Sequence, residues 1–476
     1  MKARTFRTWL AHLESKGRLV AIDKKVSLEY EIAAVAKKLD GKKAVYFSNV
    51  ENYGMPVVSG ICSTRDDFAE ALETDQYGII PKFTEAVTSP KACRKVSNQD
   101  APVKENIITE NIDLLKTFPI PVHHEMDSGN YITAGLFITR DPVTRKQNVS
   151  IHRLQISGKD KLGVLLLPRH TFHLYKQAEE EGRALECAIV VGVDPVTLLA
   201  SQASTPFGID ELEIASALRS EPLETVRCET VDIDVPAYAE IVLEGKILPH
   251  IRESEGPFGE FPKYYGPRSD KEIVQLTAVS HRKDPIFYTI IPAGYEHLLL
   301  GGIPREASLI QSVRQTVPSA VAVHMSPGGT CRYHAVVSIK KRNKGEAKNA
   351  ILAAFANSFD IKHVVVVDEE VDIFNMEEVE WAIATRFQVD KDLVVVEGAQ
   401  GSKLDPSTND GFGSKTGFDC TVPLNSEPMR YKRISIPGYA NMDIQEYLNE
   451  TSSGVNPEHL EHGNRIMHRK LSGRIP

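Results

Sequence analysis

Apolar residues recur along the chain at helical and at strand spacing, and the two kinds of segment alternate over the first hundred residues. Apolar positions three and four residues apart predict helices, and short β-branched runs predict strands. The predicted helices are residues 6–15 and 28–39, and the predicted strands are residues 18–22 and 43–47. This order is typical of an α/β module. The polar stretch 84–113 that follows is predicted to be a linker or a long connection.

Strand patterns dominate the middle of the chain. Eight β-branched runs predict strands at residues 132–139, 149–157, 161–167, 188–192, 226–231, 241–247, 273–280 and 286–291. Only two helical inserts interrupt them, near residues 172–181 and 212–220. So many strands predict a β-barrel or a sandwich. Residues 306–315 are predicted to form a connecting helix, and the alternation of strands and helices after it favours a parallel sheet with helical crossovers.

Length and composition set limits on this picture. The chain has 476 residues, of which 42% are hydrophobic and 25% charged, and this excludes a mostly disordered, collagen-like or coiled-coil protein. Its length favours about three domains. The net charge of −8 argues against a general nucleic-acid binder, which needs a basic face. Six scattered cysteines and the absence of a long apolar run predict free thiols in a cytoplasmic protein that does not enter a membrane.

Two carboxylates stand out in the segment ESEGPFGEFPKYYG, residues 253–266. Glu255 and Glu260 are separated by small and rigid residues that make a tight loop and can hold both acids against a ligand. A carboxyl group that donates a proton near neutral pH needs a raised pKa, which burial or a neighbouring anion supplies. The spacing alone is equally compatible with a surface turn whose two glutamates are solvated.

A second group of polar residues lies between residues 148 and 170. Asn148 and Arg153 have opposite parity, so a regular strand would place them on opposite faces unless a bulge or a strand end intervenes. His152 lies between them, and His170 follows Pro168 at a predicted strand-to-helix junction. Asn, His and a carboxylate can bind a divalent cation, with phosphate oxygens completing its shell. Each residue taken singly is equally compatible with a strand end that is bonded to the backbone.

Two further features give weaker signals. Lys415 lies among small residues in GFGSKTG, where it can meet a phosphate, although the spacing is not that of a nucleotide-binding P-loop and a flexible loop is the alternative. His297 and Arg305 lie around a predicted helix start in GYEHLLLGGIPR. Both can bind a carboxylate, and the alternative is a capped helix end with a solvated arginine.

Together these segments resemble the UbiD family of decarboxylases, over most of the chain up to about residue 437. The glutamate loop ESEGPFGEF with YYG, the strand motif N-x-x-I-x-R, the LPRH motif, the region of Glu211 and the segment DEEVDIFNMEEVEWAIATR match in order. The resemblance implies an α/β (α+β) fold with a central split β-barrel that binds prenylated FMN. It implies four parts, namely an N-terminal α/β domain (1–110), the barrel (111–300), a connecting helix (301–330) and a C-terminal α/β oligomerisation domain with a tail (331–476).

The resemblance also implies roles for individual residues. Matching to the family motifs makes Arg153, Glu255 and Glu260 catalytic. It assigns cofactor contacts to Thr133, Asn148, Ser150, Ile151, Arg153, Arg169, His170, Glu211 and Lys415. It assigns a divalent ion, usually manganese, to Asn148, His170 and Glu211, and a monovalent ion, potassium or sodium, to Ala200, Ser201, Ala203 and Glu211. It assigns substrate contacts to His297 and Arg305.

The implied reaction is a reversible, non-oxidative decarboxylation of an aromatic or heteroaromatic acid through a covalent adduct with the prenylated flavin, with Glu260 as the acid. The motif around His297 resembles the HmfF-like branch, which implies furan-2-carboxylate, furan-2,5-dicarboxylate or pyrrole-2-carboxylate; the alternative is a hydroxybenzoate or gallate decarboxylase. A flavin oxidoreductase and a non-catalytic subunit are further alternatives. The implied partners are the small-molecule acid, other copies of the chain in a dimer or hexamer, and a separate flavin prenyltransferase, without nucleic acid or membrane.

Overall fold

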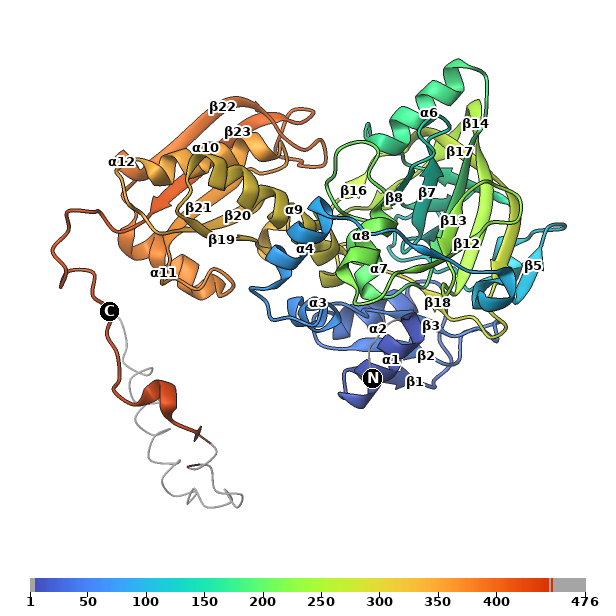
Figure 1. Ribbon diagram of the computed structural model, residues 1–476, viewed down its shortest axis with the longest axis horizontal. Helices are drawn as coiled ribbons and strands as arrows, with labels where there is room; N and C mark the ends of the chain where they lie inside the picture. The colour runs from blue at the N-terminus through green and yellow to red at the C-terminus, as the bar shows by residue number, and fades with distance from the viewer. Residues whose placement is uncertain (1–4, 445–446, 448–476) are drawn as a thin grey trace, which may run out of the picture. The chain divides into compact units, whose positions relative to one another are not determined.

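The computed structural model describes residues 5–444 and residue 447, and its chain divides into two compact units, 1–424 and 425–476 (Figure 1). The described part of the second unit contains one short 3-10 helix, η4 (Tyr439–Asn441). The rest of the predicted tail lies outside the described residues. The division does not test the predicted boundaries near residues 110, 300 and 330, which stay predictions.

The N-terminal module has the predicted alternation of helices and strands. Its helices are α1 (Phe6–Ser15), α2 (Glu31–Leu39), α3 (Arg65–Ala71) and α4 (Ile79–Thr88), and its sheet has the order β1 (Leu19–Ile22), β2 (Ala44–Phe47), β3 (Val57–Ser59) and β18 (Phe287–Tyr288). The hydroxyl of Thr5 caps α1, which buries Phe6, Trp9 and Leu13 at helical spacing. Residues 286–291 are predicted to form a strand of the central β-rich part. The strand β18 does form there, but it pairs with β3 of the N-terminal module and not with the central strands.

The central sheet has nine strands, and all of its pairings are antiparallel. Its order is β6 (Tyr131–Ile132), β9 (Leu154–Ile156), β10 (Lys161–Val164), β17 (Ser269–His281), β14 (Ile241–Glu255), β11 (Leu185–Val191), β7 (Leu136–Arg140) and β8 (Gln147–Ile151), with β5 (Asn106–Ile108) paired to β17. Six of the eight predicted strands fall in this sheet, which confirms a β-rich centre.

Chain connectivity requires this sheet to curl. Six strand-to-strand steps separate β6 from β7, and six separate β9 from β8, so in a flat sheet each pair would be about 29 Å apart. The chain crosses from β6 to β7 through residues 133–135 and from β8 to β9 through residues 152–153, and such short connections reach at most about 15 Å. The sheet is therefore a curled half-barrel, and the two crossings form a seam where its edges approach each other. We call residues 133–135 and 152–153 the seam.

Of the two predictions for the polar stretch 84–113, the structure excludes the loose linker and leaves a long connection with short elements of its own. It includes the end of α4, the strand β4 (Arg94–Lys95), two 3-10 helices, η1 (Asn98–Asp100) and η2 (Pro102–Lys104), and β5. β4 pairs with β12 (Glu224–Arg227), which also pairs with β13 (Asp234–Pro236) in a separate three-stranded sheet. The predicted strand 226–231 thus belongs to this smaller sheet.

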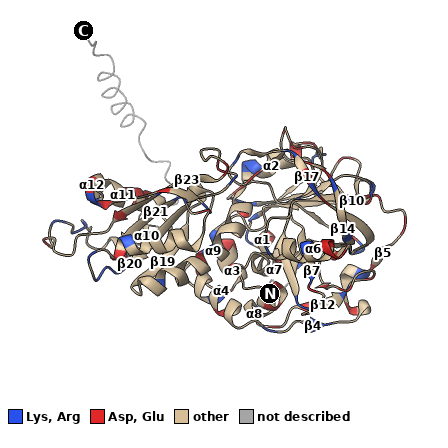
Figure 2. Cartoon of the chain, turned by 90° about the horizontal axis from the view of Figure 1, so that it is seen from above, with Lys and Arg blue, Asp and Glu red and all other residues tan. Residues whose placement is uncertain are grey.

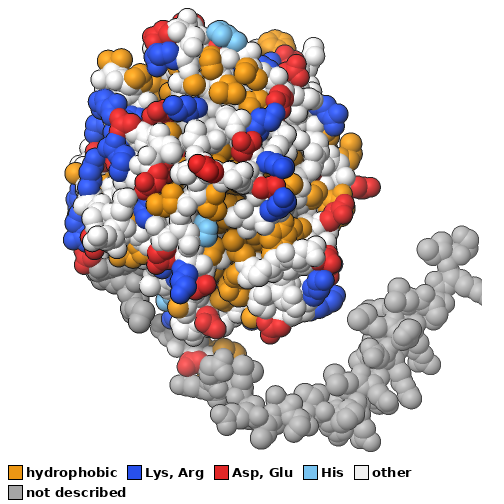
Figure 3. Space-filling view, turned by 90° about the vertical axis from the view of Figure 1, so that its right-hand side faces the viewer, with side chains coloured by type: hydrophobic (Ala, Val, Ile, Leu, Met, Phe, Trp, Pro, Cys, Tyr) orange, Lys and Arg blue, Asp and Glu red, His pale blue; other side chains and the backbone are white. Residues whose placement is uncertain are grey.

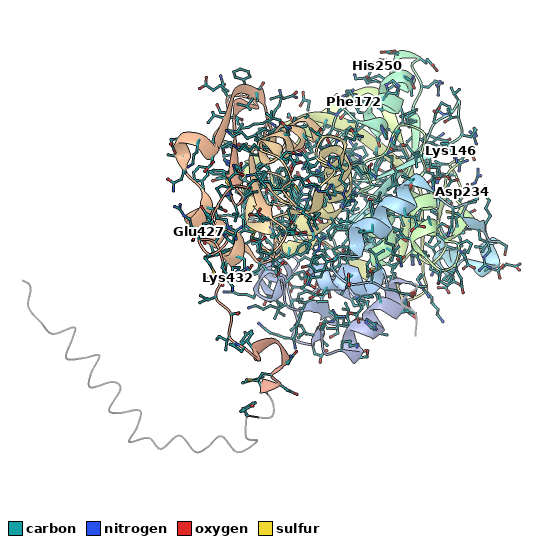
Figure 4. All side chains as sticks on the ribbon, turned by 60° about the vertical axis from the view of Figure 1, so that its left-hand side comes forward. Lys146, Phe172, Asp234, His250, Glu427 and Lys432 are labelled. Atoms are coloured by element: carbon teal, nitrogen blue, oxygen red, sulfur yellow. The ribbon has the colours of Figure 1, made fainter. Side chains whose placement is uncertain are left out.

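Four helices accompany the central sheet: α5 (Leu114–Thr117), α6 (His170–Glu180), α7 (Pro195–Ala200) and α8 (Glu211–Leu218). The two predicted inserts correspond to α6 and α8, but both helices begin one or two residues earlier, at His170 and Glu211. α6 packs on the bend of β14, where the backbone amide of His250 donates to Glu179 at 2.9 Å. Figure 4 labels Phe172 on that helix and His250 on that strand.

The connecting helix α9 (Tyr295–Thr316) is longer than predicted, because it begins eleven residues before residue 306. The helix-breaking residues Gly301, Gly302 and Pro304 led to the later predicted start. The glycines serve close packing instead: a Cβ on Gly302 would lie 2.7 Å from the Cβ of Cys331, and a Cβ on Gly301 would overlap the guanidinium of Arg332. His297 therefore lies in the first turn of the helix, at its start as predicted, whereas Arg305 lies within the helix.

The C-terminal sheet has the order β19 (Ala320–Met325), β20 (His334–Ile339), β21 (His363–Asp368), β23 (Phe412–Cys420) and β22 (Leu393–Gln400), with η3 (Pro327–Gly329), α10 (Glu346–Asn357), α11 (Met376–Arg386) and α12 (Val389–Asp392) around it. The predicted parallel arrangement is confirmed for β20, β21 and β23, whereas the edge strands β19 and β22 are antiparallel. The alternative of a flexible loop around Lys415 is excluded, because these residues form β23.

Charged residues of both signs are interspersed along the elements of the chain (Figure 2), and the face in Figure 3 carries charged side chains of both signs. All six cysteines are free, and five of them are buried. Within residues 5–444 no helix is long and apolar enough to cross a membrane.

Candidate active site

Arg153 joins the two predicted carboxylates at the seam. It lies in the short connection between β8 and β9, so strand parity does not fix the direction of its side chain. Its Nε and Nη2 donate to the two oxygens of Glu255 at 2.9 and 2.6 Å, and its Nη1 donates to Glu260. A bidentate pair of this kind fixes the guanidinium in plane and orientation. The predicted Glu–Arg–Glu group is therefore assembled in space.

The loop that carries both acids is a small hairpin. Glu255 is the last residue of β14, and the strands β15 (Phe258–Gly259) and β16 (Tyr265–Gly266) pair directly after it. Glu260 begins the turn of this hairpin and donates its backbone amide to the carbonyl of Tyr264 at 2.9 Å. The side chains of Glu255 and Glu260 are 1% and 13% exposed, so the solvated surface turn is excluded.

Burial sets the protonation of this group. Burial raises the pKa of Glu260, the charge of Arg153 partly offsets that rise, and the neighbouring charge of Glu255 adds to it. Burial alone would lower the pKa of Arg153, but Glu260 and Glu255 outweigh it and keep that pKa above its usual value. The arrangement can thus hold a proton on Glu260 beside a permanently charged guanidinium.

Tyr131 is a member of this site that the sequence analysis did not identify. Its hydroxyl donates to Oε1 of Glu255 at 3.2 Å and to Oε1 of Gln155 at 3.1 Å, and its ring packs on Phe258 with centroids 4.3 Å apart. The only hint in the sequence is that Tyr131 lies two residues before Thr133. This position indicates a role only once the curl of the sheet, which creates the seam, is known.

The predicted divalent-ion ligands are brought to one junction of β8, α6 and α8. Nδ1 of His170 lies 3.1 Å from Oδ1 of Asn148. Oε2 of Glu211 accepts from the backbone amide of Val149, the next residue of β8, at 2.6 Å. Burial raises the pKa of Glu211 to about 8, and among the described residues no Lys or Arg forms an ion pair with it.

The other predicted cofactor residues are distributed around the seam and beyond it. The hydroxyl of Thr133 contacts that of Thr289 at 3.0 Å, and Ser150 contacts Nε2 of His152 at 2.9 Å, while Ile151 ends β8. Arg169 is exposed just before α6. The amine of Lys415 donates to the carbonyls of Phe359 and Ile361, both at 2.8 Å, on the C-terminal sheet. These roles stay predictions.

The predicted monovalent-ion residues lie at the end of α7. The carbonyl of Ala200 accepts from the amide of Ala203, and the carbonyl of Ser201 accepts from the side chain of Gln202. No hydrogen bond or ion pair within residues 5–444 joins Ala200, Ser201 or Ala203 to Glu211, and this site also stays a prediction.

A cluster of basic side chains lies on α9 and beside it; we call His297, Arg305 and Arg332 the cationic cluster, after the two guanidinium groups that carry its charge. Burial and the charges of Arg332 and Arg305 lower the pKa of His297 to about 3, and burial and Arg332 lower the pKa of Arg305 to about 9. The charge of Arg332 also acts on Glu260. Arg332 therefore lies near Glu260, and its guanidinium packs on the ring of the next residue, Phe261.

Arg332 was missed by the sequence analysis. It follows the turn η3, its guanidinium lies 4.2 Å from the centroid of the Phe261 ring, and it packs on Gly301. Within the described part of the chain no group accepts a hydrogen bond from its Nη1. The only signal for it in the sequence is the pair Gly301 and Gly302, which allows a bulky side chain to approach the helix.

Comparisons with known proteins agree along the whole chain. The N-terminal, Rift-related and C-terminal domains of 3-octaprenyl-4-hydroxybenzoate carboxy-lyase (UbiD) match residues 10–87, 94–295 and 298–420. The UbiD-class enzyme HmfF from Pelotomaculum thermopropionicum, solved in complex with FMN, is 56% identical, with a TM-score of 0.92 over 94% of this chain and 100% of that one. An evolved dimeric form of HmfF was solved in complex with prFMN.

Relatives with other names also match. Anhydromevalonate phosphate decarboxylase from Methanothermobacter thermautotrophicus is 41% identical over 87% of this chain and 96% of its own. Gallate decarboxylase from Lactiplantibacillus plantarum is 33% identical over 85% of this chain and 88% of its own. These names share a decarboxylase chemistry and differ in the acid. The chain belongs to the UbiD family and is a carboxy-lyase of that family.

Proposed function

We propose that the protein decarboxylates a heteroaromatic acid that carries a second anionic group, with furan-2,5-dicarboxylate as the best candidate ahead of furan-2-carboxylate and pyrrole-2-carboxylate. The observation that carries this proposal is the cationic cluster beside Glu260. Two guanidinium groups and an imidazole are more than one reacting carboxylate needs. A second carboxylate would pair with Arg332, whose Nη1 has no acceptor among the described residues.

In this proposal the charge of each residue in the site determines its role. Arg153 and the cationic cluster bind and orient the substrate carboxylates. Glu255 holds the guanidinium of Arg153 in its plane. Glu260, whose pKa burial raises, is protonated and delivers its proton to the carbon that loses carbon dioxide. Prenylated FMN, when bound, supplies the electron sink for the negative charge left on that carbon.

The residues around the seam fit a flavin phosphate cofactor. Thr133, Ser150 and the backbone of Ile151 offer hydroxyl and amide groups at the crossing, and Arg169 offers an exposed cation at the start of α6. Lys415 would have to exchange its two carbonyl partners for phosphate oxygens. The complexes of HmfF with FMN and with prFMN support this choice of cofactor. A separate flavin prenyltransferase would supply the prenyl group.

Asn148, His170 and Glu211 fit a divalent cation, with manganese as the candidate, because they combine an amide oxygen, an imidazole and a carboxylate. Glu211 is buried without an ion-pair partner in the described chain, and a cation would compensate its charge. We predict that Mn²⁺ raises the melting temperature of the cofactor-free protein, and that Glu211→Gln removes this effect. Differential scanning fluorimetry with and without Mn²⁺ measures it, with Glu213→Gln on the same helix as control.

An equal rise of the melting temperature with Mn²⁺ in both variants would place the ion elsewhere.

For the monovalent ion, potassium or sodium, we propose the carbonyls at the end of α7 with Glu211. We also propose a homo-oligomer, a dimer or a hexamer, and the evolved dimeric form of HmfF supports association between copies of the chain.

The substrate is tested by a competition assay on protein co-produced with a flavin prenyltransferase and kept anaerobic. Furan-2,5-dicarboxylate, furan-2-carboxylate, pyrrole-2-carboxylate, 4-hydroxybenzoate, protocatechuate, gallate and anhydromevalonate phosphate would be mixed, and the loss of each followed by chromatography with mass detection. The phosphate ester is included because its decarboxylase is a 41% identical relative, and the cationic cluster would also accept a phosphate.

We predict that furan-2,5-dicarboxylate is consumed first, and that Arg332→Leu lowers kcat/KM for it by about 30- to 5,000-fold, since truncating one partner of a buried charge pair costs 2–5 kcal/mol. The monocarboxylates should lose less than about fivefold, because they have no second group to place there. Preferential loss of the phenolic acids, or an equal effect of Arg332→Leu on all acids, would contradict the proposal.

A further inference from the structure

The hairpin that carries Glu260 is supported from one side by a short turn at residues 124–128. Its own hydrogen bonds join β15 to β16, and they do not hold it against the central sheet. Contacts from the turn support it instead. The amide of Ser128 donates to the carbonyl of Pro257 at 3.1 Å, the amide of Met126 donates to the hydroxyl of Tyr265 at 3.3 Å, and two further contacts converge on Gly259.

Gly259 is held by a buried carboxylate. Its backbone amide donates to Oδ1 of Asp127 at 2.9 Å, and Oδ2 of the same carboxylate accepts from the backbone amide of His124 at 2.9 Å. The Asp127 side chain is 0% exposed. Burial raises its pKa, but the hydrogen bonds from His124 and from the Gly259 amide outweigh that and keep the pKa below its usual value. The carboxylate is therefore a permanent acceptor.

The imidazole of His124 closes the other side of Gly259. A Cβ added at Gly259 would lie 2.6 Å from Nδ1 of His124 and 3.0 Å from its Cε1, which is closer than such atoms approach. Gly259 lies in β15, and its φ is not in the left-handed region, so the absence of a side chain serves close approach and not backbone conformation. Asp127 and His124 thus hold Gly259, the residue directly before Glu260, by a hydrogen bond on one side and by close packing on the other.

We propose that Asp127 is a positioning residue for Glu260, with His124 as the stop against which Gly259 rests. The proposal rests on the proposed function, in which Glu260 delivers the proton. A misplacement of about 1 Å at a reacting group costs on the order of 10²-fold in rate. A hairpin that lost the Gly259 bond would keep both acids and lose the fixed distance between Glu260 and the bound substrate.

The test uses four variants of the full chain loaded with cofactor, with kcat and KM measured on the acid that the competition assay selects. Asp127→Ala should lower kcat by about 10- to 100-fold and change KM by less than about threefold. Asp127→Asn keeps an oxygen for the Gly259 amide but turns its NH2 group toward the backbone amide of His124, so it should recover only part of kcat. Gly259→Ala should lower kcat like Asp127→Ala, because the new methyl group meets His124.

The fourth variant, His124→Ala with Gly259→Ala, distinguishes positioning from a general structural defect. Removing the imidazole makes room for the methyl group, so the double variant should have a higher kcat than Gly259→Ala alone. Hydrogen exchange measured by mass spectrometry on cofactor-free protein gives an independent readout. Peptides within residues 256–266 should exchange at least about tenfold faster in Asp127→Ala, whereas peptides of β20 should not change.

Wild-type kcat in Asp127→Ala, unchanged exchange of residues 256–266, or a double variant no better than Gly259→Ala would each overturn the proposal. If the wild-type protein consumes none of the acids, the proposed substrates fail instead. The exchange of residues 256–266 would still report whether Asp127 holds the hairpin.

Discussion

Replacing Glu260 by Gln is expected to lower kcat by about 10²- to 10⁴-fold, the range that a positioned general acid contributes. The amide has the size of the carboxyl group and keeps an oxygen for Arg153, so the hairpin should hold its shape. It has no proton to deliver to the substrate carbon. Anaerobic initial rates with the preferred acid measure the loss, and the flavin absorbance of the same sample measures cofactor occupancy.

The control for this variant lies on β14, the strand that leads into the same hairpin. Glu253 forms an ion pair with Lys161 at 2.6 Å and is 37% exposed, so Glu253→Gln should keep activity within about twofold because exposed pairs contribute little. A Glu260→Gln protein that retains cofactor and turns over within tenfold of the wild type would show that another group delivers the proton.

The pH dependence follows from the same carboxyl group. The reaction needs Glu260 protonated, and burial raises its pKa above the usual value for a glutamate. The rate should therefore be highest below that pKa and fall as the pH rises through it. Because Glu255, Arg153 and Glu260 share hydrogen bonds, the pH at which kcat falls belongs to the group and not to one residue. Asp127→Ala should lower the rate at every pH without changing the pH at which kcat falls.

The sequence predicted the members of the Glu–Arg–Glu group but not the reason they meet. Glu255 and Glu260 could be found because Gly and Pro between them mark a tight loop. Arg153 was ambiguous, because strand parity separated it from Asn148. The ambiguity is resolved by the seam, where β8 ends and β9 begins at opposite edges of the sheet. Closure of a sheet depends on pairings far apart in the chain, which local patterns do not encode.

The substrate side of the site was predicted less well. Local propensity placed a helix start near residue 306, because Gly301, Gly302 and Pro304 disfavour a helix. Packing overrides propensity there, since Arg332 and Cys331 occupy the space that side chains at the glycines would fill. Arg332 becomes partly buried only when two separate segments pack together. Its position therefore follows no periodic pattern in the sequence, and its role could be recognised only from the fold.

Glu306, the residue after Arg305, is the second position where a single change should have a large effect. Its Oε2 lies 2.7 Å from Nη1 of Arg65 on α3, and its Oε1 contacts Nδ1 of His324 at 3.0 Å and accepts from the amide of Met325 at 2.9 Å on β19. The side chains of Arg65 and Glu306 are 8% and 1% exposed. One buried carboxylate thus joins α9 to the N-terminal module and to the C-terminal sheet.

Replacing Glu306 by Leu is expected to lower the free energy of unfolding by about 3–5 kcal/mol, because it leaves the charge of Arg65 buried without a partner. Urea denaturation followed by tryptophan fluorescence measures the loss. Glu369→Gln, which breaks the exposed pair with Lys340, is the control and should cost less than about 1 kcal/mol.

The double variant Arg65→Met with Glu306→Leu separates charge from shape. Removing both charges together should restore most of the stability, since replacing a buried ion pair by apolar residues of similar size is often neutral. If the double variant stays as unstable as Glu306→Leu, the hydrogen bonds to His324 and Met325 carry the effect and the ion pair does not. Arg305 lies next to Glu306 on the same turn of α9, so the buried pair can also affect substrate binding. The single variant should then have a lower kcat/KM for the dicarboxylate, and the double variant should recover it. This result would show that the pair of Arg65 and Glu306 also sets the position of the cationic cluster.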